Sequence, residues 1–229
     1  MEKTTDVTKS LWTLEADMIF LNHGSYGATP KEILSEQQRW RARLESQPCR
    51  FINHEAPTAI RHSAAKLADF LSAAPDDIVF VENTTSGINA VLNSISFEAG
   101  DEVLVSDHIY NAVRNSILFQ IESVGAKLVV ASVGLPLSNE KEIVDKFCLG
   151  INKKTRLIVV DHVASVSGVV FPVDAIAKKA QAKNISILVD GAHAPGMLDL
   201  DVPSLGVDWY VGNCHKWLCS PKGAAFIWA

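Results

Sequence analysis

The sequence predicts an α/β fold: a mostly parallel sheet of seven strands with helices on both faces. Two observations lead to this prediction. From Ile78 onward, short runs of β-branched and apolar residues alternate with segments whose apolar residues recur at helical spacing. The strand-like runs are almost continuously apolar, as in strands that are buried on both faces of a parallel sheet. Repeated strand–helix–strand units favour this architecture.

Each strand is expected where the apolar run is short and rich in β-branched residues. The expected strands are 78–81, 102–106, 127–133, 156–160, 185–189, 209–211 and 225–228. Between them, helical spacing predicts helices that include 88–95, 113–121, 143–148 and 172–180. Asn139 with Glu142 three positions later is a capping-box pattern, and Pro172 suits the start of a helix.

The first sixty residues lack this alternation. Pro30 and Glu32 mark a helix start, the polar segment 31–46 predicts a long helix, and a second helix is expected over about 59–71. We therefore divide the chain into an N-terminal arm and helix, residues 1–60, and a large domain, residues 61–229.

Composition limits the class of function. The 229 residues are 48% hydrophobic and 21% charged, as in a globular protein, and a net charge of −5 offers no basic surface for nucleic acid or an anionic membrane. No apolar stretch reaches the roughly 18 residues of a membrane span. The start lacks the apolar core of a signal peptide, and no cysteine pair has metal-site spacing. We expect a cytoplasmic protein without a metal.

Polar residues follow the expected strands, at the sheet edge where α/β proteins bind ligands. Thr84-Thr85-Ser86-Gly87 follows the first strand and opens a helix, which suits a phosphate, although this motif alone is more often an ordinary helix cap. His108 follows the second strand and could stack on a ligand ring, although alone it fits a surface or capping role. Asp161, His162 and Ser165 form another polar cluster after the fourth strand.

Two charged residues follow the last two parallel strands. Asp190 directly ends a strongly apolar strand, where it needs a positive partner. Lys216 follows the next strand among small and aromatic residues, which could lower its pKa enough for it to act as a nucleophile. Neighbouring strands lie about 5 Å apart, so both residues can share a site. A phosphate cradle, a ring-stacking histidine, an aspartate and a lysine together match the needs of pyridoxal 5'-phosphate.

From about Phe20 onward, the chain resembles the class V aminotransferase family of fold-type-I pyridoxal-phosphate enzymes, and within it the isopenicillin-N epimerase-like proteins. The motifs that carry the resemblance are FLNHGSYGATP (20–30), ENTTSGIN (82–89), DHIYNAV (107–113), DHVASVSG (161–168), VDGAHAPG (189–196) and VGNCHKWLCSPKG (211–223). The resemblance implies the large domain of that fold and an enzyme that acts on an amino acid.

The resemblance also implies roles at the cofactor ring. Lys216 would form the Schiff base with the cofactor, and Asp190 would pair with its pyridine nitrogen. His193 would lie near the phenolic oxygen, and His108 would stack on the ring and handle protons. Ser165 would lie near the ring, at a position where related enzymes often have asparagine.

Further residues are implied at the two ends of the site. The phosphate would be held by Thr84, Thr85, Asn213 and His215. Asn22 and His23 match a loop that lies close to the substrate in the family. The resemblance implies a homodimer as well, because fold-type-I enzymes usually build the site across a subunit interface.

The chain ends at Ala229, soon after Lys216. The family's smaller C-terminal domain, which completes the substrate pocket, is therefore expected to be absent. One hypothesis is an enzyme of epimerase, cysteine desulfhydrase or lyase, or aminotransferase type, since all three begin with proton abstraction by the lysine. The other is a truncated, catalytically incomplete cofactor-binding protein. A nicotinamide dehydrogenase and a serine hydrolase are disfavoured because the sequence lacks GxGxxG and GxSxG.

Overall fold

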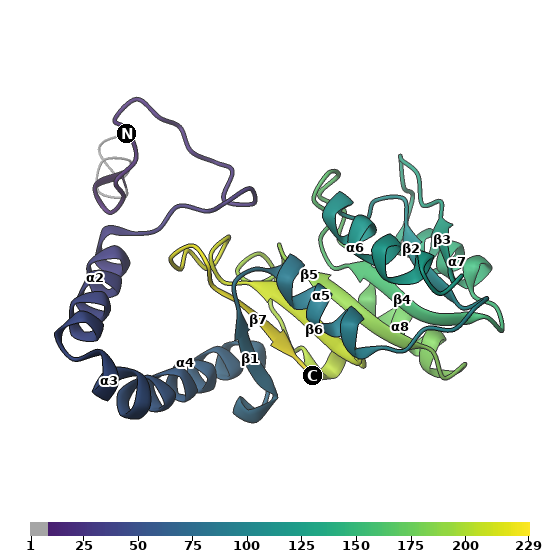
Figure 1. Cartoon of the computed structure of the whole chain (residues 1–229). Helices are drawn as coiled ribbons and strands as arrows, with labels where there is room; N and C mark the ends of the chain where they lie inside the picture. The colour runs from purple at the N-terminus through teal and green to yellow at the C-terminus, as the bar shows by residue number, and fades with distance from the viewer. Residues whose placement is uncertain (1–8) are drawn as a thin grey trace.

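The computed structural model describes residues 9–229 and confirms the predicted α/β fold. Seven strands form one sheet with the order β1-β7-β6-β5-β4-β2-β3 (Figure 1). The strands are β1 (Ile78–Val81), β2 (Glu102–Ser106), β3 (Lys127–Ala131), β4 (Thr155–Asp161), β5 (Ser186–Gly191), β6 (Trp209–Asn213) and β7 (Ala225–Trp228). Strands β2 to β6 are parallel to one another, whereas β7 is antiparallel to both β6 and β1.

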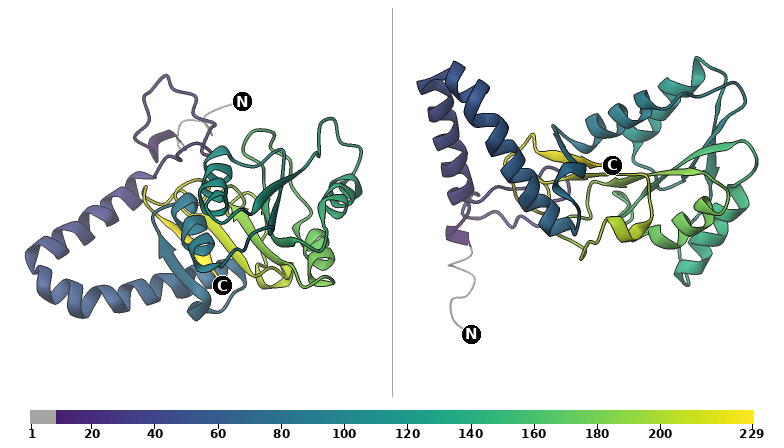
Figure 2. Two further views of the ribbon diagram at one scale, coloured as in Figure 1. Left: turned by 45° about the vertical axis from the view of Figure 1, so that its right-hand side comes forward. Right: turned by 90° about the horizontal axis from the view of Figure 1, so that it is seen from below.

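Helices cover both faces of the sheet (Figure 2). Helices α5 (Thr84–Ser94) and α6 (Asn111–Glu122) pack on one face, and α4 (Ala56–Leu71), α7 (Glu140–Gly150) and α8 (Val173–Gln181) on the other. In β4, Leu157 and Val159 belong to the core under α5 and α6, whereas Ile158 and Val160 belong to the opposite core. Successive strand side chains point to opposite faces, so a strand covered on both sides is apolar at every position.

Strand β7 lies between β1 and β6, although it comes last in the chain. Its first residue, Ala225, is the register partner of Val81 in β1 and of Asn213 in β6. The insertion therefore makes β1 an edge strand. It also brings the start of α5, which follows β1, to the end of β6.

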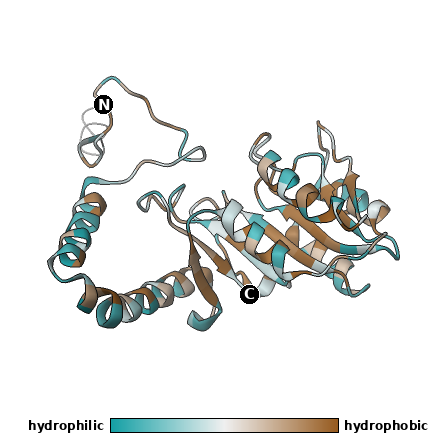
Figure 3. Cartoon of the chain, in the orientation of Figure 1, coloured by the Kyte–Doolittle hydropathy of each residue, from teal (hydrophilic) through white to brown (hydrophobic). Residues whose placement is uncertain are grey.

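The N-terminal arm extends away from the sheet as two helices (Figures 1 and 2). Helix α2 (Lys31–Ser46) leads through α3 (Pro48–Arg50) and the π-helical turn η1 (Phe51–Glu55) into α4. Within the described chain α2 has no buried residue, in keeping with its polar sequence (Figure 3), whereas α4 buries three residues against the sheet. The division expected after residue 60 falls inside α4, so this helix connects arm and body. Residues 1–8 of the expected arm lie outside the described residues.

The loops at the carboxyl ends of β2, β4, β5 and β6 share one edge of the sheet because these strands are parallel. Asn139 accepts a hydrogen bond from the Glu142 N–H (3.2 Å), which confirms the predicted cap of α7. The short 3-10 helices η2 (Pro75–Asp77) and η3 (Pro203–Leu205) lie in connections outside this edge. Among residues 9–229, no helix combines the length and apolarity that crossing a bilayer requires.

Candidate active site

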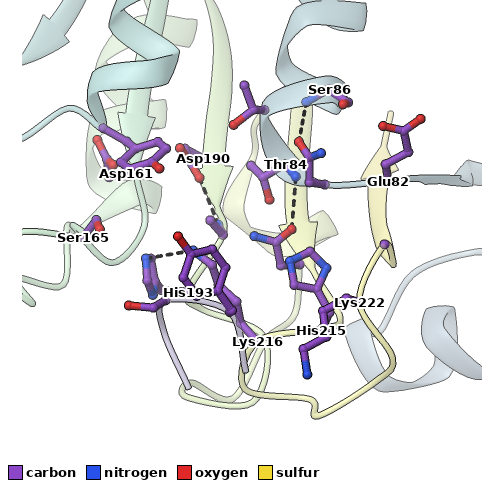
Figure 4. A pocket seen from close by; sticks show the side chains of 18 residues that line it. Glu82, Thr84, Ser86, Asp161, Ser165, Asp190, His193, His215, Lys216 and Lys222 are labelled. Atoms are coloured by element: carbon purple, nitrogen blue, oxygen red, sulfur yellow. Dashed lines mark hydrogen bonds between the residues drawn. The ribbon is translucent and has the colours of Figure 1, made fainter. Parts of the chain in front are cut away.

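A cavity of about 790 Å³ opens at the carboxyl ends of the strands (Figure 4). Its lining brings together most of the predicted site residues: Thr84, Thr85, Ser165, Asp190, His193, Asn213, His215 and Lys216. His108, Asn22 and His23 lie outside this lining. Strands far apart in the sequence thus place a lysine, an aspartate and a helix N-terminus around one space.

Lys216 contacts His193 inside the cavity. The Lys216 Nζ atom lies 3.1 Å from His193 Nε2, and the Trp217 indole N–H approaches His193 Nδ1 at 3.4 Å. Burial and the nearby Lys216 lower the pKa of His193 to about 4, so its imidazole is neutral near neutral pH. An indole N–H only donates, and the tautomer that satisfies both contacts therefore carries its proton on Nε2, facing Nζ. This contact favours the uncharged amine.

The surroundings of Lys216 also favour its uncharged form. Burial lowers the pKa of the Lys216 amine, and the negative charge of Asp190 opposes that effect. A lowered pKa leaves a larger fraction of the lysine uncharged near neutral pH, and the uncharged amine is the form that acts as a nucleophile or a base.

Asp190 is a buried carboxyl group, only 4% exposed, at the end of β5. Its Oδ1 accepts a hydrogen bond from the Ala192 N–H (2.9 Å). Burial raises the pKa of Asp190, whereas that hydrogen bond and the charge of Lys216 lower it. No side-chain nitrogen of a described lysine, arginine or histidine lies within 4.0 Å of it. A buried carboxylate without a cation at contact distance suits a cationic N–H group of a ligand.

The opposite end of the cavity is formed by the start of α5. The Thr84 N–H donates to Asn213 Oδ1 (3.0 Å), and Asn83 caps the helix by accepting from the Ser86 N–H (2.8 Å). The buried Thr84 Oγ1 has no hydrogen-bond partner among the described residues. An unpartnered buried hydroxyl beside a helix N-terminus fits an anionic group such as a phosphate.

His215 lies at the same end of the cavity. Its Nδ1 atom is 2.8 Å from the carbonyl oxygen of Ala224, an acceptor, so Nδ1 carries a proton and donates. Burial is the main cause that lowers the pKa of His215, and the imidazole is then neutral with a free Nε2 acceptor. Because Nδ1 already donates to Ala224, His215 can donate an N–H to an anion only if its Nε2 gains a proton.

His108 lies outside the lining of the cavity. Its Nδ1 lies 2.8 Å from Ser167 Oγ, and its ring packs edge-on against Phe171 at 5.8 Å between centroids. Tyr110, two residues later, lines the cavity and is 44% exposed. The sequence assigned no role to Tyr110, although an exposed aromatic residue after a strand is a signal for a ligand contact.

The predicted substrate loop lies beside the lysine segment. Asn22 accepts from the Ser25 N–H (3.1 Å), and the His23 ring packs 5.9 Å from the Trp217 ring. Ser25, rather than these two residues, lines the cavity. Gly27 has φ +71°, and a Cβ atom there would lie 1.9 Å from the His215 carbonyl oxygen, so only glycine allows this close approach.

Three charged lining residues, Glu82, Asp161 and Lys222, received no role from the sequence. Asp161 ends β4 next to Asp190. Lys222 lies near the end of the cavity that is formed by the start of α5. A strand-ending aspartate gives the same signal at 161 as at 190. No group of three potential metal-binding side chains occurs within residues 9–229.

The family model for aminotransferase class-V matches residues 19–229. The chain belongs to the class V aminotransferase family. It is 32% identical over 214 residues to an isopenicillin N epimerase of Streptomyces clavuligerus, covering 93% of this chain and 54% of that protein. It is 30% identical over 229 residues to a probable chloroplastic L-cysteine desulfhydrase of Arabidopsis thaliana, covering 93% and 48%. The chain thus spans about half the length of the curated relatives it matches.

Solved structures of class V aminotransferase fold agree with the predicted large domain. A cystine C-S lyase, C-DES, in complex with cysteine persulfide has a TM-score of 0.82 at 23% identity, covering 93% of this chain and 57% of that one. A variant of that lyase, with glycine covalently linked to its PLP cofactor, has a TM-score of 0.79 at 22% identity over the same shares. These likenesses confirm the fold-type-I architecture.

Proposed function

We propose that this chain carries the cofactor-binding domain of a pyridoxal-phosphate-dependent enzyme that acts on an amino acid. The observation that supports it most is the cavity that holds Lys216 and the buried Asp190 together, with the unpartnered hydroxyl of Thr84 at its other end. When bound, pyridoxal phosphate supplies an electron-withdrawing ring that stabilises negative charge at the substrate α-carbon.

The ring would be held by three residues. Lys216 supplies the amine that attaches the cofactor, and Asp190 accepts a hydrogen bond from the pyridine nitrogen. His193 directs its Nε2 proton to the place of Lys216 Nζ, where a phenolic oxygen can accept it. Ser165 lines the cavity next to this region, and His108 is proposed for the ring face.

The phosphate would be held by Thr84, Thr85, Asn213 and His215. Asn213 already binds the Thr84 N–H, so its main effect is to orient the first turn of α5. The helix N-terminus and the Thr84 hydroxyl then meet the anion.

The chemical step would use Lys216 as the base. With pyridoxal phosphate bound, the uncharged Lys216 Nζ would take a proton from the substrate α-carbon. Asn22 and His23 would keep the loop of Ser25 at the substrate side. An epimerase outcome requires a second acid or base on the opposite face, and His108 is the candidate. Whether the outcome is epimerisation, cysteine desulfuration or lysis, or transamination stays open among these residues.

A second candidate function is a catalytically incomplete cofactor-binding protein. The chain spans about half the length of its curated relatives. Both candidates share cofactor attachment, and they differ in turnover. Amino-acid turnover by the purified chain supports the first, and cofactor binding without turnover of any amino acid supports the second.

Attachment is tested by adding pyridoxal phosphate, reducing with borohydride and mapping the modified peptide by mass spectrometry. The modification is expected at Lys216 and not at Lys222, the other lysine that lines the cavity. It should be lost in Lys216→Ala and kept in Lys178→Ala, whose side chain is 74% exposed on α8. Labelling spread equally over several lysines would contradict the proposal.

A homodimer and a cytoplasmic location are part of the proposal. The homodimer is supported by family membership, and its measurement is the molar mass in solution with and without cofactor. The location is tested by fluorescence microscopy of the tagged protein, since one relative is described as chloroplastic.

A further inference from the structure

Asp161 is a buried acidic residue of the cavity that the proposed function does not use. It ends β4, is only 3% exposed and lines the cavity. It is the register partner of Asp190 on the adjacent parallel strand β5. Figure 4 shows the two aspartates next to each other. Since neighbouring strands lie about 4.8 Å apart, the two carboxyl groups occupy one small buried region.

The groups around this pair carry little compensating charge. Behind the sheet edge, Tyr210 and His162 form a buried hydrogen bond of 2.9 Å between the phenol and Nδ1. Burial raises the pKa of Tyr210 well above its usual value and lowers the pKa of His162 to about 4, so both are neutral near neutral pH. His193 is neutral as well, for the reason given above.

Among the described residues that face the pair, Lys216 is the group that can carry a positive charge, and it acts on Asp190. Asp190 also accepts the Ala192 N–H. For Asp161, the backbone near Tyr110 lowers the pKa less than burial and the charge of Asp190 raise it. When it is protonated, Lys216 therefore favours a negative charge on Asp190 over one on Asp161.

Two like charges in a buried region cannot both form without a large loss of hydration. Burial and the charge of Asp190 together raise the pKa of Asp161 well above its usual value. Burial raises the pKa of Asp190 too, but Lys216 and the Ala192 N–H act against it. The geometry and the charges agree on which carboxyl group keeps a proton.

We propose that Asp161 and Asp190 form a carboxyl pair that shares one negative charge, with the proton on Asp161 and the charge on Asp190. Asp161 is then a positioning residue. By staying neutral, it leaves Asp190 as the single anion for the pyridine nitrogen. This consequence rests on the proposed function, whereas the proton assignment concerns the chain alone.

The assignment is tested by carboxyl-carbon NMR titration of the cofactor-free protein labelled at aspartate. In Asp190→Asn, the pKa of Asp161 should fall by on the order of two units, because it no longer ionises beside an anion. In Asp161→Asn, the pKa of Asp190 should stay the same, because its neighbour is neutral in both proteins. Asp145→Asn removes an equal charge from the exposed face of α7 and should shift neither.

Each result of the titration decides the assignment. A fall in the Asp190 pKa in Asp161→Asn, with no change in the Asp161 pKa in Asp190→Asn, would place the proton on Asp190 and overturn the assignment. No change in either variant would show that the two carboxyl groups do not interact. If the variants do not fold, the wild-type protein decides, since two carboxyl groups titrating near the usual aspartate value would also overturn the proposal.

A binding measurement separates this inference from the proposed function. Pyridoxal phosphate affinity should weaken about ten- to hundredfold in Asp190→Asn, as for loss of a charged hydrogen bond, and by less than about threefold in Asp161→Asn. Equal loss in both variants would overturn the neutral role of Asp161. If wild-type protein does not bind pyridoxal phosphate, the proposed function fails, and the titration still tests the pair.

Discussion

Replacing Thr84 with valine should stabilise the cofactor-free protein and weaken cofactor binding at the same time. The Thr84 side chain is 4% exposed, and its Oγ1 has no hydrogen-bond partner among residues 9–229. A buried hydroxyl without a partner costs about 1–3 kcal/mol, and a methyl group of similar size removes that cost. The backbone hydrogen bond to Asn213 is unaffected. We therefore expect a gain of about 1 kcal/mol, or roughly 2–4 °C in Tm.

The same substitution removes a hydrogen bond to the proposed phosphate. A hydrogen bond to a charged group contributes about 1.5–3 kcal/mol, so pyridoxal phosphate should bind about ten- to hundredfold more weakly to Thr84→Val. Thermal or denaturant unfolding of the cofactor-free protein measures the first effect, and a fluorescence titration with pyridoxal phosphate measures the second.

Thr155→Val is the matched control. Thr155 is also buried, at 8% exposure, but its Oγ1 accepts a hydrogen bond from the Asn152 N–H at 2.9 Å. Valine there should destabilise the protein by about 1 kcal/mol and leave cofactor affinity unchanged. The reasoning is refuted if Thr84→Val lowers the stability of the cofactor-free protein as the control does, or if its cofactor affinity equals that of the wild type.

Three further predictions follow from neighbouring contacts. Gly191→Ala should destabilise the protein by about 1–3 kcal/mol in denaturant unfolding, because its Cβ would lie 2.2 Å from the buried Tyr210 ring; unchanged stability would contradict this packing. Burial lowers the pKa of His162 to about 4, below the value of about 6.5 in the unfolded chain. Between about pH 4 and 6.5 His162 is therefore neutral in the folded protein, and the unfolded state binds more protons. The free energy of unfolding should therefore fall by up to about 3 kcal/mol as pH drops from about 6.5 to 4, and His162→Gln should flatten this slope; an equal slope in both proteins counts against it. His108→Ala and Tyr110→Ala, titrated side by side with pyridoxal phosphate, identify the ring-face residue, whose loss should weaken affinity roughly fivefold; wild-type affinity in both would exclude either residue.

Much of the fold could be predicted because its signals are local. The strand β4 is apolar at every position from Leu157 to Val160, and this pattern alone indicates a strand covered on both faces. The cap at Asn139 likewise depends on residues three positions apart. Such features follow from a few consecutive side chains and need no knowledge of the rest of the chain.

The site could be predicted in part for the same reason. Parallel strands end at one edge, so Asp190 and Lys216 were expected to share a cavity once their strands were recognised. The phosphate role of Thr84 came from its place at a helix start and from the family resemblance, whereas the role of His193 came from the resemblance alone. The structure adds the contacts of both residues inside the cavity. Tyr110 was missed because the choice between it and His108 depends on which ring turns towards Ser167.

The amino-acid sequence by itself determined which segments become strands and helices and which polar residues stand at their ends, because periodicity and capping act over a few residues. Only the tertiary structure decided the insertion of β7 beside β1, which brings Thr84 to Asn213, and the register that places Asp161 beside Asp190. Strand order and register arise from the packing of distant segments into one core, so no local pattern contains them.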